Sequence, residues 1–155
     1  MSQARAPVLY KAYGVPDTLD GRYEMFALHL SLLVNRLADD GDYADFSQEL
    51  YDKCFGNIDK GLRDAGIGDM GVPKHMKRMM KGFNGRVHAY SEGLKGGVSV
   101  KTLDEAVARN IYGTLEKPSK ETVRAMRSYM KANAKALAAP SLNDIMNGSV
   151  SFKNA

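Results

Sequence analysis

Apolar residues recur at every third or fourth position along residues 43–65, and this spacing constrains the fold more than any other feature of the chain. The members of the series are Tyr43, Phe46, Leu50, Cys54, Ile58, Leu62 and Ala65. They fall on one face of an α-helix, whereas a half-buried strand requires alternation at every second position. Other segments show the same spacing, and no pair of alternating segments interrupts them. The sequence therefore predicts an all-α fold.

Turn residues divide the chain into about six principal helices. We expect these helices at residues 7–14, 17–38, 43–65, 71–90, 102–113 and 118–139, followed by a short last turn at 141–148. A chain of 155 residues has the size of one domain. Residues 1–155 are therefore predicted to form a compact single-domain helical bundle. Residues 1–6 are expected to be a frayed start, and residues 149–155 an extended tail in which Val150 and Phe152 dock.

Capping residues mark several of these boundaries. The candidates are Asp17 or Thr18 for the second helix, Thr102 with Glu105 for the fifth, and Ser141 with Asp144 for the last turn. A Ser, Thr or Asp side chain at these places accepts a hydrogen bond from a backbone N–H that the helix leaves free. The segments 39–42 and 96–97 carry the Asp and Gly residues of turns.

The segment from Met25 to Leu37 is apolar on nearly all sides, which is typical of a central, buried helix. It is interrupted by His29, Ser31, Asn35 and Arg36. The segment therefore falls short of the roughly 18 apolar residues that a membrane-spanning helix needs. Residues 1–15 also lack the apolar core and cleavage site of a secretory signal. We expect a soluble or peripheral protein.

Residues 71–90, which read GVPKHMKRMMKGFNGRVHAY, carry five Lys or Arg residues and no Asp or Glu. The same helix carries an apolar stripe that begins with three methionines, whose flexible thioethers suit an irregular apolar partner. One interpretation is a partner-binding surface, and the other is a core stripe with a solvated basic face. The residues that would form the binding surface are Lys74, Lys77, Arg78, Met79 and Lys81.

Arg22, in the segment GVPDTLDGR (14–22), is the sixth candidate partner-binding residue. It lies near the N-terminus of a helix, where the helix dipole disfavours positive charge. Arg22 therefore needs a carboxylate partner or binds something outside the protein. Residues 42–65 hold six acids against three bases, so an acid of that third helix is the favoured internal partner.

Sequence patterns linked to catalysis, cofactors and metals lack the context that their chemistry needs. Residues 66–71, GIGDMG, match the letters of a dinucleotide-binding fingerprint, but a helix precedes them where that motif needs a strand. Their glycines are better explained as a loop that ends a helix. His29, His75 and His88 do not have metal-ligand spacing, and His29 is expected to be a hydrogen-bonded core imidazole. We expect no enzyme activity, no catalytic residue, no metal and no cofactor.

Four blocks of the sequence occur in the order in which they occur in a known family. The blocks are GVPDTLDGRYEMFALHLSLLVNRL (14–37), LRDAGIGDMGVPKHMKRMMKGFNGRVHAY (62–90), ARNIYG (108–113) and IMNGSVSF (145–152). Together they resemble the ubiquinol–cytochrome c chaperone family over about residues 8–152. The resemblance implies an all-helical assembly factor and not an enzyme. Eukaryotic members engage newly made cytochrome b at the inner membrane during biogenesis of respiratory complex III, together with a partner protein.

The resemblance implies cytochrome b, nascent or newly inserted, as the client of this chain. A second assembly factor and the membrane surface are further candidate partners. Because no N-terminal targeting extension is visible, we expect a bacterial member at the cytoplasmic face of the inner membrane; a mitochondrial member would act on the matrix side. The basic residues of 71–90 favour anionic lipid headgroups. Client loops on that side are themselves rich in Lys and Arg, which opposes a direct contact with them.

Two other classes of function remain as alternatives. A basic RNA- or ribosome-binding helical module would show steeply salt-dependent RNA binding. A small-molecule or haem-related enzyme would show a pocket lined by polar residues and a bound cofactor. The net charge of +4 is mild, and adjacent segments of opposite sign can attract each other. Nucleic acid is therefore not the expected partner.

Overall fold

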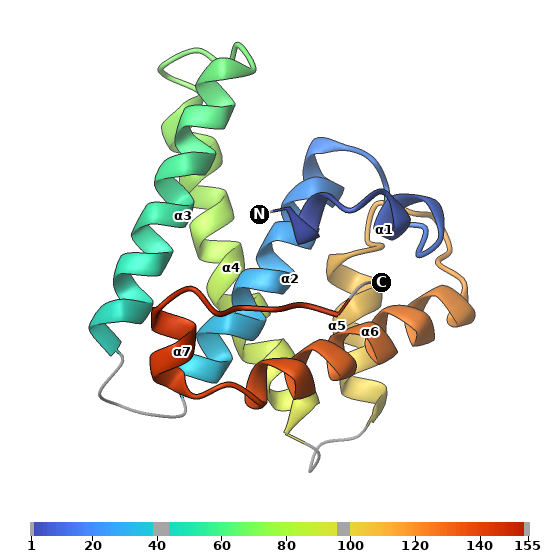
Figure 1. Cartoon of the computed structure of the whole chain (residues 1–155). Helices are drawn as coiled ribbons and strands as arrows, with labels where there is room; N and C mark the ends of the chain where they lie inside the picture. The colour runs from blue at the N-terminus through green and yellow to red at the C-terminus, as the bar shows by residue number, and fades with distance from the viewer. Residues whose placement is uncertain (1, 39–43, 96–99, 154–155) are drawn as a thin grey trace.

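The computed structural model describes residues 2–38, 44–95 and 100–153, and helices are the only regular secondary structure of these residues (Figure 1). The elements are a 3-10 helix η1 (Gln3–Arg5) and the α-helices α1 (Pro7–Lys11), α2 (Leu19–Leu37), α3 (Ala44–Asp64), α4 (Val72–Leu94), α5 (Val100–Asn110), α6 (Lys120–Ala138) and α7 (Leu142–Met146). The predicted all-α class is confirmed. The predicted segments correspond in order to α1–α6, and the predicted last turn is α7.

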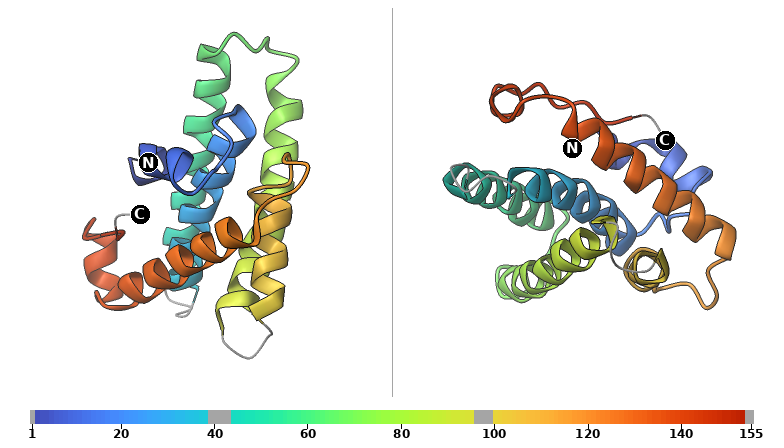
Figure 2. Two further views of the ribbon diagram at one scale, coloured as in Figure 1. Left: turned by 90° about the vertical axis from the view of Figure 1, so that its right-hand side faces the viewer. Right: turned by 90° about the horizontal axis from the view of Figure 1, so that it is seen from below.

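Helix α2 lies at the centre, with the α3–α4 hairpin on one side and α1, α5 and α6 on the other (Figures 1 and 2). It begins after Thr18, whose hydroxyl accepts a hydrogen bond from the backbone N–H of Gly21 at 3.1 Å. Every residue from Glu24 to Leu32 is buried, which confirms the predicted central helix. A helix that packs against neighbours on two sides has no face left for polar residues, and this explains the nearly continuous apolar sequence.

The buried side chains form two clusters on opposite faces of α2. Met25 and Leu28 belong to the first cluster, which includes residues of α1, α5 and α6. Phe26 and Leu30 belong to the second cluster, which includes residues of the α3–α4 hairpin. Burying one such side chain stabilises the fold by about 1.5–3 kcal/mol. Helix α2 is therefore held firmly from both sides, and the α3–α4 hairpin has a core of its own.

The two ends of the described chain are anchored to α6. The frayed start expected for residues 1–6 is wrong for the described residues, because Gln3 donates to the Tyr129 hydroxyl at 3.0 Å and to the Lys153 carbonyl at 3.1 Å. The tail has no regular structure over residues 149–153, and Val150 and Phe152 pack against the first cluster as expected. Periodicity could not predict the anchored start, because the bonds of Gln3 join residues 126 and 150 positions apart.

The predicted boundaries between helices have mixed outcomes. The glycine-rich loop after α3 is confirmed, with Gly66 in the left-handed region at a φ of +82°. The Ser141–Asp144 capping box is confirmed as well. The predicted cap Thr102 is wrong, because α5 begins at Val100 and Thr102 lies in its first turn. The turns predicted at residues 39–42 and 96–97 lie outside the described residues, as does Tyr43 of the predicted stripe.

Candidate partner-binding site

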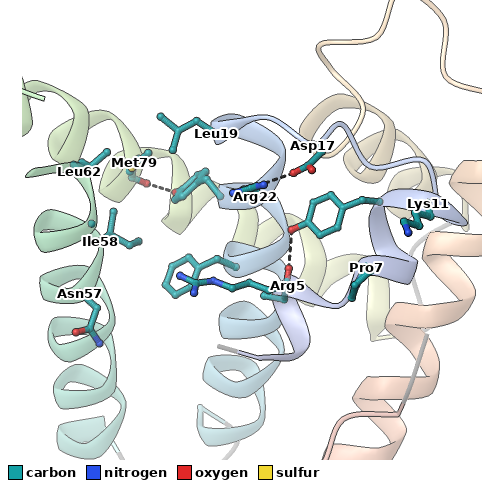
Figure 3. Close-up of a pocket in the computed structure, with 15 residues that line it drawn as sticks. Arg5, Pro7, Lys11, Asp17, Leu19, Arg22, Asn57, Ile58, Leu62 and Met79 are labelled. Carbon is teal, nitrogen blue, oxygen red and sulfur yellow. Dashed lines mark hydrogen bonds and ion pairs between the residues drawn. The ribbon is translucent and has the colours of Figure 1, made fainter. Parts of the chain in front are cut away.

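A groove of about 800 Å³ lies between α3 and the chain segment that runs from η1 to the start of α2. In Figure 3, Ile58 and Leu62 of α3 lie on one side of it, and Arg5 and Arg22 on the other. Apolar side chains dominate its lining and come from Pro7, Tyr10, Leu19, Tyr23, Phe26, Ile58, Leu62 and Met79. The charged lining residues are Arg5, Lys11, Arg22 and Asp17. A concave apolar surface with a few polar groups is the usual form of a binding site.

The wall of the groove at the start of α2 depends on two glycines. Gly14 has a φ of +65°, a left-handed conformation that glycine adopts without steric cost, and it turns the chain after α1. Gly21 lies in the first helical turn of α2 and packs directly against Pro16, in the segment between α1 and α2. A Cβ atom on Gly21 would lie 1.9 Å from the carbonyl oxygen of Pro16. Only glycine fits at this contact. The close approach brings Asp17 and Arg22 together at the edge of the groove.

Arg22 forms an ion pair with Asp17, with 2.7 Å between Arg22 Nε and Asp17 Oδ1. The hydrogen bond from Arg22 lowers the pKa of Asp17, and the same bond raises the pKa of Arg22. The prediction of a carboxylate partner is confirmed, but the favoured partner, an acid of the third helix, is wrong. The turn before α2 supplies the acid instead. Both side chains are more than half exposed, so Arg22 remains accessible to a partner.

Buried polar contacts between α2 and α4 support the floor of the groove. Tyr23 donates its hydroxyl hydrogen to the Met79 carbonyl at 2.6 Å. Arg86 lies over the Tyr23 ring, 5.5 Å from its centroid, and its Nε donates to Glu24 Oε2 at 2.6 Å. Burial raises the pKa of Glu24, against the opposing effect of Arg86. These contacts fix the position of Tyr23, which lines the groove.

The structure divides the six residues predicted to bind a partner between two surfaces and the core. Arg22 lies at the groove, whereas Lys74, Lys77 and Lys81 are exposed on α4 and do not line it. We call these three residues the lysine face. A second hollow of about 580 Å³ lies beside the lysine face. Its lining residues are Tyr51, Pro73, Met76, Lys77, Met80, Lys81 and Asn84.

Arg78 and Met79 have different surroundings. Arg78 is exposed, lies 3.7 Å from Asp20 of α2 and does not line the second hollow. Met79 is only 4% exposed and packs in the second cluster with Phe83. Met79 is therefore not part of the exposed basic surface, because this position of the stripe faces α2, and its predicted contact with a partner stays a prediction. Met79 contributes to the floor of the groove only.

The sequence interpretation missed several residues of the groove. Arg5 lies in the segment that was expected to be frayed, and Ile58 is one of many residues on the α3 stripe. Leu19 is 51% exposed in the first turn of α2. An apolar residue directly after a capping residue, where polar side chains are usual, is the one signal in the sequence that points to this surface.

No group of three or more His, Cys, Asp or Glu residues in the described parts of the chain is placed to hold a metal ion. Among the described helices, none has the length and apolar character needed to cross a membrane.

Comparisons with known proteins agree with the resemblance noted from the sequence. The family model described as ubiquinol-cytochrome C chaperone matches residues 11–152. The crystal structure of the Cbp3 homolog from Brucella abortus is similar with a TM-score of 0.83 and 34% sequence identity, covering 99% of this chain and 83% of that one. No curated protein matches the chain. The chain therefore belongs to the ubiquinol–cytochrome c chaperone family.

Proposed function

We propose that this protein is an assembly chaperone for respiratory complex III that holds newly made cytochrome b in the groove between α3 and the start of α2. Membership of the chaperone family over residues 11–152 is the observation that carries the proposal. The apolar lining of the groove supports it, since a chaperone for a membrane protein must cover apolar segments before they are inserted or paired. A groove of about 800 Å³ has room for several side chains of such a segment.

In this proposal the groove acts by burial and not by chemistry. Leu19, Ile58 and Tyr23 would remove apolar client side chains from water, which stabilises the complex by about 25 cal/mol for each Å² of apolar surface covered. Arg22 would bind polar groups of the client at the edge. The proposed location is the cytoplasmic face of a bacterial inner membrane, where cytochrome b is made. A second assembly factor is a further proposed partner.

Gly61 offers a way to block the groove without disturbing the fold. It lines the groove on α3 and is exposed, and a Cβ atom there would meet no other atom within 4 Å. Gly61→Trp should therefore fill the groove. Gly56→Trp is the matched control, because Gly56 is equally open and exposed on the same helix but does not line the groove. Either change also replaces a glycine in the interior of a helix. A glycine there is about 1 kcal/mol less favourable than an alanine, so its removal does not weaken the helix.

The experiment is affinity capture from native membranes with wild type and both variants. We expect both variants to fold as wild type does, and only Gly61→Trp to lose cytochrome b. A Gly61→Trp protein that captures cytochrome b normally would exclude the groove as the client site. Deleting the protein should lower assembled complex III more than the other respiratory complexes. Normal complex III and cytochrome b in the deletion strain would contradict the chaperone function itself.

A further inference from the structure

The lysine face of α4 consists of cations that have no ion-pair partner among the described residues. Lys74, Lys77 and Lys81 are exposed, and none of them forms an ion pair with a carboxylate of the described residues. Their neighbours on α4 differ in this respect, since Arg78 lies near Asp20 and Arg86 is paired with Glu24. No acidic residue occurs in α4 before Glu92. The positive charge of the lysine face is therefore available to an external partner.

Exposed methionines accompany the lysine face. Met70 lies in the loop just before α4 and is 95% exposed, and Met80 is 37% exposed beside Lys77 and Lys81 in the second hollow. The α3–α4 hairpin extends beyond the rest of the molecule at this loop (Figure 1). Flexible apolar side chains next to lysines are typical of helices that lie on a membrane surface, where lysines meet headgroups and apolar groups enter the acyl boundary.

We infer that the lysine face, together with Met70 and Met80, binds the surface of a bilayer that contains anionic lipids. The kinds of exposed side chain favour lipid over single-stranded nucleic acid. The exposed large hydrophobic residues of the described chain are Leu19, Met70, Met80, Leu115 and Met146. None of them is aromatic, whereas proteins that bind single-stranded nucleic acid stack bases on aromatic side chains.

The inference deepens the proposed function, because it gives the chaperone a contact with the membrane that receives its client. It rests on different residues, since neither the lysine face nor Met80 lines the groove. The groove and the second hollow therefore have no lining residue in common. The contact also avoids the Lys- and Arg-rich loops of the client, because lipid headgroups and not those loops meet the lysines.

The test is sedimentation of the full chain with vesicles of phosphatidylcholine, alone or mixed with phosphatidylglycerol. Wild type should bind the mixed vesicles and not the neutral ones, and binding should weaken as salt rises. The triple variant Lys74→Glu, Lys77→Glu, Lys81→Glu should lose about a hundredfold or more in affinity, since each lysine near an anionic surface contributes about fivefold. Met70→Ser with Met80→Ser should weaken binding without changing its salt dependence.

A charge-matched control separates a specific face from net charge. Lys120, Lys131 and Lys135 are exposed on α6, and changing all three to Glu alters the net charge equally. This variant should still bind the mixed vesicles within a few-fold of wild type. The inference is wrong if the α4 triple variant binds as wild type does, if the α6 variant loses as much, or if a mixed-sequence RNA oligomer displaces the vesicles. Cytochrome b capture by the same variants is scored separately, so the failure of one proposal is distinguishable from failure of the other.

Discussion

The hydroxyl of Tyr129 lies 2.7 Å from Nε2 of His29, inside the first core cluster. Nδ1 of His29 lies 2.6 Å from the Met25 carbonyl oxygen. Because a carbonyl only accepts hydrogen bonds, Nδ1 carries the proton and Nε2 accepts from Tyr129. The Tyr129 hydroxyl accepts in turn from Gln3. A neutral imidazole therefore links α2 and α6, and through Tyr129 the start of the chain, and the predicted core role of His29 is confirmed.

The first prediction concerns acid stability. Burial lowers the pKa of His29 from 6.5 to about 4. As pH falls through this interval, the unfolded chain takes up a proton that the folded protein does not, so the free energy of unfolding should fall. The pKa difference corresponds to a loss of about 3 kcal/mol in the free energy of unfolding once the pH is below both pKa values. Urea unfolding of wild type and His29→Gln between pH 7 and pH 4 measures it.

The variant His29→Gln should be less stable than wild type at pH 7, but its stability should depend less on pH over the same interval. His88→Gln is the control, because His88 is exposed on α4. It should keep the pH dependence of wild type. An unchanged pH dependence in His29→Gln would show that other groups cause the loss of stability in acid.

The second prediction concerns the hydroxyl of Tyr129. Tyr129→Phe leaves Nε2 of His29 and the amide of Gln3 without this partner, and an unsatisfied buried polar group costs about 1–3 kcal/mol. Tyr51→Phe should change the free energy of unfolding by less than about 0.5 kcal/mol, since no described hydrogen bond involves the Tyr51 hydroxyl. Denaturant unfolding compares the two, and equal costs would contradict the role assigned to Tyr129.

The third prediction concerns the pair of Glu24 and Arg86 beneath the groove. The two side chains are 8% and 18% exposed, so Glu24→Leu leaves a mostly buried guanidinium without its carboxylate. We expect this change to cost about 3–5 kcal/mol of unfolding free energy. Adding Arg86→Met should restore part of the loss, because both charges are then absent. The single variant Arg86→Met completes the comparison. If the double variant loses as much unfolding free energy as the two single variants together, the two residues are not coupled.

The fourth prediction uses two adjacent methionines. Met79 is buried in the second cluster, and Met80 is 37% exposed. Met79→Ala should cost about 2–5 kcal/mol, the range for truncating a buried methionine, whereas Met80→Ala should cost about 0.5 kcal/mol or less. Thermal and urea unfolding measure both. Similar costs for the two variants would contradict the orientation of α4.

Much of the fold follows from local sequence. The three-and-four spacing of apolar residues predicts the helices, because a helix repeats every 3.6 residues and only one face can meet a core. Thr18 and Ser141 are recognisable as caps because their hydrogen bonds reach only three residues along the chain. Family membership is also visible in the sequence, since the four blocks occur in the family's order and are spread from residue 14 to residue 152. None of these inferences needs to know how the helices are arranged.

The groove, and whether a cation of α4 is paired or exposed, depend on contacts between residues that are far apart in the sequence. Met79 and Met80 are both apolar residues on one helix, and the position of α2 decides which of them is buried. Arg86 of α4 is paired with Glu24, 62 positions away in the sequence, whereas the lysine face of the same helix meets no carboxylate of the described residues. The N-terminal wall of the groove is held by Gln3 through a residue 126 positions away. Local patterns describe one helix at a time, whereas these relationships arise only when all the helices pack together.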